Sequence, residues 1–353
     1  MKQFNRRAVL KSGAAALGAS LAPFRTSLAQ TPSKIRFVGS AAVARADLGF
    51  MFAGITTGIY KELGIDADFA TVAGSAASIQ LLVANQAQLA HVGMLELLTA
   101  KRTNPTLPIQ AVYLQDVLSG YEIVVQETSA IKSVAELKGK KIGLISLATG
   151  AIPVVKAMLH QAGLAPDAVE MLPVGTGAQA LAALRSDRVQ ALSLFRGSHA
   201  AIENLGVKLR YFMPQVPSSV FAVNTTQFAR NRDDIVRALQ GVVMNSVYLQ
   251  TNPAAGVRAF WAQFGKPTSN EEKDMQDNMT IITRAAELWK PLGSPGPYGD
   301  MSDSTWLSLL DFVGPAFDFD RTQIKNVYTS SLIAEINKAD IKRAIAMAQA
   351  EKK

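Results

Sequence analysis

The sequence contains no cysteine, and that absence excludes several kinds of chemistry. Disulfide bonds, thiolate metal sites, iron–sulfur clusters and cysteine nucleophiles all require this residue. Histidine is also scarce: the chain has His91, His160 and His199, and their spacing matches no metal-binding motif. No stretch reaches the ~18 consecutive apolar residues typical of a membrane-spanning helix. We therefore expect a protein that has no metal centre and is not embedded in a membrane.

Acidic residues are absent from the N-terminal segment. Residues 1–29 carry five of the 36 basic residues, and Asn5–Lys11 reads NRRAVLK, which resembles a twin-arginine export signal. A short apolar stretch, Ser12–Ala22, follows, and Ser27–Ala29 has the small-x-small pattern of a cleavage site. We expect residues 1–29 to be a signal peptide that is cleaved near Ala29 and directs the chain to the periplasm. A basic disordered tail is the alternative.

Setting this segment aside changes the interpretation of the net charge. The whole chain has a formal charge of +8, but residues 30–353 hold 31 basic and 28 acidic residues. They contain no basic run interleaved with aromatic residues, the pattern typical of a nucleic-acid-binding surface. The charge therefore indicates no nucleic-acid partner.

Short apolar runs alternate with longer helical stretches through most of the chain. Such alternation favours an α/β fold with largely parallel sheets. We expect helices over residues 48–63 and 233–251, and the length of 353 residues allows about two domains. Strands are expected at Lys34–Gly39, Ile65–Ala70, Leu89–Gly93, Ile109–Gln115, Tyr121–Gln126, Lys141–Ile145, Val169–Pro173, Gln190–Leu194 and Ser219–Val223.

One pattern occurs twice along the chain. Gly74 and Gly175 each precede a hydroxyl residue, an expected helix, a polar turn and a strand. Each glycine also lies 16 residues before an alanine of that strand, Ala90 in the first case and Ala191 in the second. The repeat predicts two similar α/β units.

Glycine and a hydroxyl residue stand together at three expected helix starts: Gly74–Ser75, Thr149–Gly150 and Gly175–Thr176. Free backbone N–H groups and the helix dipole make such a start suitable for binding an anion. Capping by Ser or Thr is the simpler interpretation of each case alone. Because each start follows a strand, all three would lie at the edge where open α/β sheets bind ligands.

No catalytic motif accompanies these helix starts. The sequence lacks a G-x-S-x-G elbow, a G-x-x-x-x-G-K-[ST] phosphate loop and a G-x-G-x-x-G turn after a strand. His91 lies in an apolar run, which favours a core histidine. We therefore expect that the chain is not an enzyme; a secreted enzyme is the alternative. Four single carboxylates could pair across a cleft, or could each be solvated or salt-bridged: Asp47, Glu96, Asp116 and Glu122.

Several segments together resemble one protein family. The longest is Ser133–Gly143, which reads SVAELKGKKIG, and the others are Ile35–Gly39, Gly58–Ala67, Ala182–Ala191 and Phe221–Thr225. They are similar to the NMT1-like periplasmic substrate-binding proteins of ABC importers, which bind nitrate, sulfonates, taurine or thiamine precursors. The resemblance covers nearly all of residues 34–335. In the turns where the family usually has Gly and Asp, this chain has Asn85–Gln88 and Ser186–Gln190. Asn tolerates the left-handed backbone that such turns need.

The resemblance implies a periplasmic-binding-protein fold of type II, in which two Rossmann-like lobes joined by a two-segment hinge close over a ligand. Lobe one would comprise residues 31–120 and 221–353, lobe two residues 121–217, and the hinge would lie near 119–125 and 214–223. It also implies a monomer without a cofactor or a catalytic group. Such a protein delivers its small-molecule ligand to the permease and ATPase subunits of an importer. A receptor of the same fold that serves a sensor is the alternative.

Loops that follow the strands should face the cleft, and we expect the ligand-binding residues there. Arg196 directly follows a strand and is the candidate for a bidentate clamp on an oxyanion; an ion pair with Glu203 is the alternative. Tyr113 and Phe195 could form apolar walls or belong to the core. These features predict a small organic anion, such as a sulfonate or a carboxylate, as the ligand. The candidate ligand-binding residues are Ser40, Ala41, Ser75, Ala76, Gly93, Met94, Tyr113, Ser146, Thr149, Gly150, Thr176, Phe195, Arg196, Ser218 and Ser219.

Overall fold

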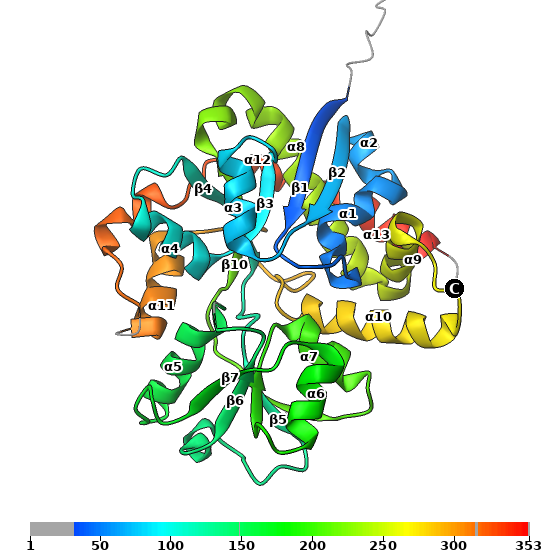
Figure 1. The fold of residues 1–353 in the computed structure, drawn as a ribbon. Helices are drawn as coiled ribbons and strands as arrows, with labels where there is room; N and C mark the ends of the chain where they lie inside the picture. Colours follow the sequence, from blue (N-terminus) through cyan, green and yellow to red (C-terminus); the bar gives the residue numbers. More distant parts are fainter. Residues whose placement is uncertain (1–31, 148, 315–316, 352–353) are drawn as a thin grey trace, which may run out of the picture. The chain divides into compact units, whose positions relative to one another are not determined.

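The computed structural model describes residues 32–147, 149–314 and 317–351, which build two five-stranded sheets with helices around them (Figure 1). The expected signal peptide, residues 1–29, lies outside the described residues. Both sheets belong to the same compact unit, which begins at Pro32.

The first sheet has the strand order β2-β1-β3-β10-β4. Three of its strands pair in parallel, and β10 runs antiparallel between β3 and β4. Neighbouring residues of β1 point to opposite faces: Phe37 packs in the core with α1 and α8, and Val38 packs in the core with α3 and α4. Both are fully buried, because helices cover both faces of the sheet. The strands are β1 (Ser33–Gly39), β2 (Ile65–Thr71), β3 (Leu89–Gly93), β4 (Ile109–Asp116) and β10 (Ser219–Asn224), and the helices named here are α1 (Gly49–Thr57), α3 (Ser75–Val83), α4 (Met94–Thr103) and α8 (Thr225–Thr251).

The second sheet repeats this plan with the order β7-β6-β8-β5-β9. Here β6 pairs in parallel with β7 and β8, and β5 runs antiparallel between β8 and β9. The same relative order in both sheets confirms the two similar units predicted from the repeat. The elements are β5 (Ile123–Gln126), η2 (Val134–Leu137), β6 (Lys141–Leu144), α5 (Ala151–Gln161), β7 (Glu170–Pro173), α6 (Gly177–Arg185), β8 (Ala191–Ser193), α7 (Arg196–Glu203) and β9 (Leu209–Phe212).

The chain passes between the sheets twice. Residues 117–122 join β4 of the first sheet to β5 of the second, and residues 213–218 lead back from β9 to β10. Each passage delivers the antiparallel strand of the sheet it enters. We propose to treat the first sheet with its helices as lobe one and the second with its helices as lobe two, joined by these two passages.

The turns before β3 and β8 have matching backbone conformations. Asn85 has φ 56° and Asp187 has φ 55°, so both occupy the left-handed region. Asn and Asp reach that region more easily than other residues with a side chain, because their short polar groups bond locally. The left-handed turn expected without glycine is therefore confirmed.

The helices expected over 48–63 and 233–251 both differ from the structure. The helix expected over 48–63 is interrupted at Gly58, whose φ of 85° ends α1, and α2 (Ile59–Glu62) follows. The helix expected from residue 233 begins eight residues earlier, at Thr225. It starts there because the Asn224 side chain accepts a hydrogen bond from Thr226 N at 2.9 Å and caps the first turn.

The remaining elements complete the C-terminal half. They are α9 (Pro253–Phe264), α10 (Glu271–Ala286), α11 (Asp303–Val313), η4 (Arg321–Asn326), α12 (Ile333–Ile336) and α13 (Ile341–Ala350), and a single turn, η1 (Ala46–Leu48), precedes α1. Within residues 32–147, 149–314 and 317–351, no helix combines the length and the apolar character needed to cross a membrane.

Candidate functional site

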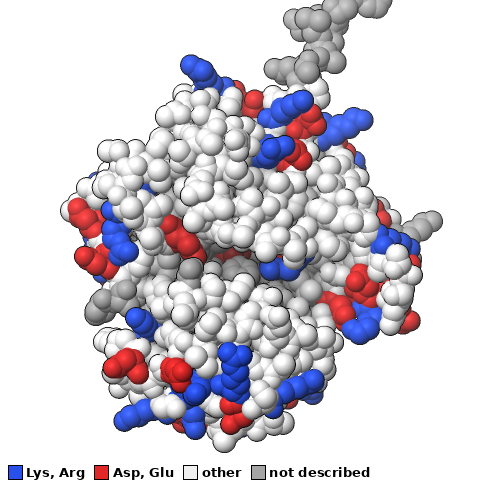
Figure 2. Space-filling model, viewed as in Figure 1, with Lys and Arg blue, Asp and Glu red and all other residues white. Residues whose placement is uncertain are grey.

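The carboxyl ends of the parallel strands in both sheets lead into one region between the lobes. At the start of α4, Met94 N donates a hydrogen bond to Ser218 O at 2.9 Å, and Tyr121 OH donates to Glu96 Oε1 at 3.3 Å. Lobe one thereby contacts both passages. The molecular surface is hollowed between the two sheets, and acidic and basic side chains gather at the hollow (Figure 2). We therefore build the candidate site from the residues of this region.

Ser218, in the second passage, forms hydrogen bonds to residues of the first passage. Its Oγ accepts a hydrogen bond from Gly120 N and donates one to Leu118 O, both at 3.0 Å. Its backbone N donates to Asp116 O at 3.1 Å. A hydroxyl at this position therefore holds the two passages in a fixed relation to each other.

Ser219 joins a histidine and a carboxylate at the end of the first sheet. Its hydroxyl donates to the Asp116 carboxylate, and its Oγ lies 2.6 Å from His91 Nε2. All three residues are buried. Burial lowers the pKa of His91 to about 4 and raises the pKa of Asp116 to about 7. The ring of His91 also meets that of Phe50 edge-on at 5.0 Å, so it is a hydrogen-bonded core histidine, as the sequence favoured.

Arg196 is buried between two carboxylates. Its Nη2 lies 2.5 Å from Glu122 Oε2, and its Nη1 lies 2.5 Å from Glu287 Oε2. Glu122 also contacts His199 Nδ1 at 3.0 Å. The guanidinium is 1% exposed, so its charge is already matched inside the protein.

The specific ion pair considered for Arg196, with Glu203, is wrong. Glu203 pairs instead with Arg284, whose Nε lies 3.2 Å from Glu203 Oε2. The ring of Tyr211 lies 5.4 Å from the guanidinium of Arg196 and 5.2 Å from that of Arg284. These contacts dock α7 of lobe two against α10.

A second arginine, Arg45, enters the region from the loop after β1. Its Nε donates to Asp47 Oδ1 at 2.9 Å and its Nη2 to Asp47 Oδ2 at 2.7 Å. Asp47 is 2% exposed, whereas 24% of the Arg45 side chain is exposed. Sequence reasoning named Asp47 and missed Arg45. Its position, shortly after a strand end and two residues before that carboxylate, was the available indication.

Glu96 lies between the two lobes at the start of α4. A Cβ placed on Gly93 would lie 2.0 Å from its Oε2, and one placed on Gly150 of lobe two would lie 2.3 Å from its Oε1. Two glycines therefore make room for this carboxylate. Burial raises the pKa of Glu96, and hydrogen bonds from its own backbone and from Tyr121 oppose that shift. The four carboxylates considered from sequence thus have internal partners: arginine for Asp47 and Glu122, and a hydroxyl for Glu96 and Asp116.

Several of the predicted binding residues connect strand ends. Ser40 Oγ donates to His91 O at 2.6 Å, Ser75 Oγ accepts from Gly93 N at 3.0 Å, and Thr149 Oγ1 accepts from Ala151 N at 3.3 Å. Partly buried or exposed positions at the same strand ends and helix starts are taken by Ala41, Ala76, Ser146, Gly150 and Thr176.

The two predicted aromatic walls differ. Tyr113 lies in the hydrophobic core, 2% exposed, with its ring 6.0 Å from that of Phe221. Phe195 is partly exposed and meets Tyr121 edge-on at 5.7 Å, at the junction of α7 with the first passage. Phe195 is therefore near the interlobe region, and Tyr113 serves as core.

The helix starts at this region share one property. The N-cap residues of α3, α4, α5, α6 and α7 contribute no side-chain hydrogen bond to their helix. By contrast, α8, α9, α10, α11 and α13 are each capped by an Asn, Ser or Asp side chain. An uncapped first turn can retain backbone N–H groups that solvent or a ligand satisfies. In α4, α5 and α7 one such group already has a partner, since Met94 N donates to Ser218 O, Ala151 N to Thr149 Oγ1 and Arg196 N to Gly120 O.

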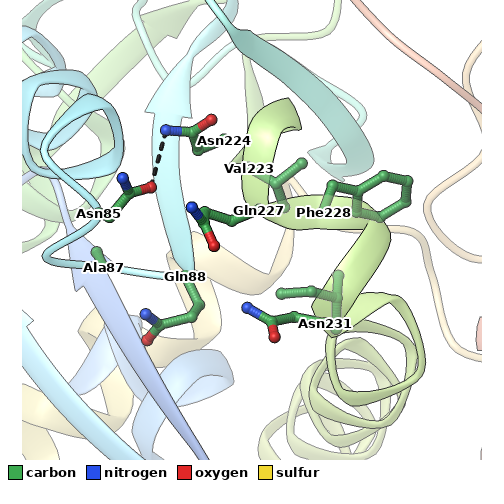
Figure 3. A pocket seen from close by; sticks show the side chains of 9 residues that line it. Asn85, Ala87, Gln88, Val223, Asn224, Gln227, Phe228 and Asn231 are labelled. Carbon is green, nitrogen blue, oxygen red and sulfur yellow. Dashed lines mark hydrogen bonds between the residues drawn. The ribbon is translucent and has the colours of Figure 1, made fainter.

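A separate pocket of about 100 Å³ lies at the amino ends of the parallel strands in the first sheet (Figure 3). Asn224 Nδ2 donates to Asn85 Oδ1 at 3.0 Å within it. A cavity of roughly 10–15 Å³ in this measure holds one water, so the space suits several waters, and we assign no ligand to it. Its lining residues are Asn85, Ala87, Gln88, Val223, Asn224, Gln227, Phe228, Asn231 and Ile235.

Two like sheets, two chain passages and a polar region between the sheets define a protein with the periplasmic-binding-protein fold. The family model described as NMT1/THI5 like matches residues 46–255. The chain belongs to this family, as its sequence motifs predicted. No curated protein matches the chain.

Three solved structures illustrate the similarity of fold. The periplasmic aliphatic sulphonate binding protein from Escherichia coli has a TM-score of 0.63 and 16% identity, over 89% of this chain and 97% of that one. The alkanesulfonate-binding protein from Xanthomonas axonopodis pv. citri has a TM-score of 0.60 and 14% identity, over 84% and 98%. The periplasmic nitrate-binding protein from Synechocystis PCC 6803 has a TM-score of 0.61 and 14% identity, over 92% and 99%. At these identities the similarity establishes the fold.

Proposed function

We propose that the protein is an extracytoplasmic solute-binding protein that captures a small organic anion between its lobes and delivers it to an ABC import permease. The observation that carries the proposal is the set of helix starts without side-chain caps, α3 and α4 from lobe one and α5, α6 and α7 from lobe two. A ligand held by N–H groups from both lobes stabilises the closed form over the open one. The similarity of fold to sulfonate- and nitrate-binding proteins supports the same class of ligand.

The ligand-binding residues of this proposal are those at the facing strand ends. They are Ser40, Ser75, Gly93, Thr149, Gly150, Thr176, Phe195 and Ser218, with Arg45 added from the structure. Arg196, Tyr113 and Ser219 support the site from within the protein. Their burial argues against direct contact with a ligand.

A thermal-shift screen tests the ligand class. The purified chain is heated with nitrate, ethanesulfonate, taurine, benzoate and a neutral hydroxymethylpyrimidine, each in the same buffer. We expect the organic anions to raise the melting temperature in a concentration-dependent way. Stabilisation by the neutral pyrimidine alone would contradict the proposal. Mass spectrometry of the mixtures checks that the ligand is bound and released unchanged.

Export and delivery form the second half of the proposal. We propose that residues 1–29 direct the chain to the periplasm and are removed after Ala29. N-terminal sequencing of the exported protein should then begin at Gln30. Loss of uptake of the stabilising anion upon deletion of the gene would support delivery to a permease. If uptake of the anion is unchanged but the cell no longer changes its transcription in response to that anion, the protein is a receptor that serves a sensor.

A further inference from the structure

We infer that Arg45, held in place by Asp47, is the cation that binds the anionic group of the ligand. The inference rests on the proposed function, because it names a residue of that same site. Sequence reasoning gave this role to Arg196, which follows a strand in lobe two. The contacts of the two arginines favour Arg45.

Arg196 has no charge left for a ligand. Glu122 and Glu287 each approach it to 2.5 Å, and the guanidinium is 1% exposed. An incoming anion would have to displace a carboxylate from a buried pair, and breaking such a pair is costly. Arg196 is therefore a structural cation.

Arg45 differs from Arg196 in exposure: both guanidinium groups hold nitrogens without a hydrogen-bond partner, but those of Arg196 are buried. Asp47 takes Nε and Nη2 of Arg45, while its Nη1 has no hydrogen-bond partner among residues 32–147, 149–314 and 317–351. About a quarter of the side chain remains exposed. A guanidinium fixed on one side and open on the other is pre-organised for an oxyanion, because little side-chain freedom remains to be lost on binding.

Arg45 belongs to lobe one and lies close to the backbone of lobe two. A Cβ added at Gly197, in the first turn of α7, would lie 2.5 Å from Asp47 Oδ2 and 3.2 Å from Arg45 Nη2. The pair therefore approaches the backbone of lobe two where a side chain is absent. The charges of Asp47 and Arg45 also act on the pKa of His91, although burial is the larger cause of its shift. The guanidinium thus lies against the start of α7 and close enough to His91 for its charge to act there.

The test compares anion binding by matched variants in titration calorimetry, with nitrate, ethanesulfonate and benzoate as probes. We expect Arg45→Gln to weaken binding of the best of these probes at least tenfold, and Arg45→Lys to weaken it less, since it keeps the charge but loses the fork. Arg36→Gln is the control, because this arginine of β1 forms an exposed pair with Asp68 of the edge strand β2. The control should bind as the wild type does.

Arg45→Gln leaves the buried Asp47 without a cation and could unfold the chain. The double variant Arg45→Gln/Asp47→Asn removes both charges, and circular dichroism checks that it is folded. Wild-type affinity in the folded double variant would overturn the inference and leave the proposed function standing. Failure of the wild type to bind any of the three probes would instead contradict the proposed function, and the inference with it.

Discussion

Arg196 Nη1 and Glu287 Oε2 lie 2.5 Å apart and join α7 of lobe two to the residue that follows α10. On its other side the same guanidinium meets Glu122, which is fully buried at the start of the second sheet. One arginine therefore links the first passage, lobe two and the C-terminal half of the chain. This position makes Arg196 a determinant of stability.

Replacement of Arg196 by Ala should destabilise the protein strongly. It leaves Glu122 buried without its cation, and removing one partner of a buried ion pair costs about 3–5 kcal/mol. Glu287→Gln is the matched control, because its carboxylate is 41% exposed and water can replace the lost pair at a cost of about 1 kcal/mol or less. Urea unfolding followed by circular dichroism measures both. Equal and small effects would show that Glu122 does not depend on Arg196.

Alanine substitutions at two glycines of one loop, Gly296 and Gly299, distinguish the cost of backbone strain from the cost of a steric clash. Gly299 has φ 76° and Gly296 has φ 85°, so alanine at either position adopts a left-handed backbone at a cost of about 1–2 kcal/mol. A Cβ at Gly299 would also lie 2.1 Å from the ring of buried Tyr113, whereas nothing lies within 4 Å at Gly296. We expect Gly299→Ala to cost about 1–3 kcal/mol more than Gly296→Ala in urea unfolding. Similar losses in the two variants would mean that the Tyr113 ring moves aside freely.

The sequence was informative where local chemistry decides the structure. The spacing from Gly74 to Ala90 and from Gly175 to Ala191 predicted two like units, which appear as the same strand order in both sheets. The left-handed turn at Asn85 followed from the residue type alone. The break at Gly58 was missed because a glycine inside an apolar helical pattern is compatible with a continuing helix.

The charged partners in the candidate site could not be obtained in that way. Arg196 and Glu287 are 91 residues apart, and the pattern near Arg196 suggested the close but incorrect partner Glu203. Arg45 was passed over, although its partner Asp47 is only two residues away, because its approach to α7 depends on how the lobes pack. Pairing across lobes leaves no periodic trace in a single sequence.

Asp116 should make stability depend on pH in a defined direction. Burial raises the pKa of Asp116 in the folded state to about 7, against 3.8 for an ordinary aspartate, so the folded state keeps a proton that the unfolded chain releases. Its contribution to stability is therefore lost as pH rises from about 4 to about 7. His91 acts in the opposite sense, because its folded pKa of about 4 lies below 6.5 and stability is lost as pH falls through that window.

The substitution Asp116→Asn isolates the pH dependence of stability that Asp116 contributes. The free energy of unfolding of the variant relative to the wild type should increase between about pH 4 and about pH 7, by an amount on the order of a few kcal/mol. Urea unfolding at several pH values across that range measures the difference. The charges of Asp47 and Arg196 also act on this carboxyl, so both residues are left unchanged. A difference that stays constant with pH would contradict the raised pKa.

Glu96→Gln should strengthen anion binding. The substitution removes a negative charge that lies against Gly150 at the start of α5, where the proposed ligand is held. At an effective dielectric of about 20, two charges about 8–16 Å apart repel by about 1–2 kcal/mol, which corresponds to roughly five- to thirtyfold in affinity. The probe is whichever of ethanesulfonate and benzoate binds the wild type, titrated by calorimetry. Glu127→Gln, at the end of β5, removes an exposed charge and serves as the control.

The pH profile of the same titration separates repulsion from a change in shape. Burial raises the pKa of Glu96, so this carboxyl becomes protonated as pH falls through a range above that of an ordinary glutamate. The affinity of the wild type should then approach that of Glu96→Gln at low pH, whereas the affinity of the variant should change little over the same range. If the variant instead binds more weakly than the wild type at neutral pH, Glu96 accepts a hydrogen bond from the ligand. The ligand would then carry an amino or hydroxyl group beside its anionic one, which donates to the carboxylate in addition to Tyr121 OH and the backbone N–H of Glu96.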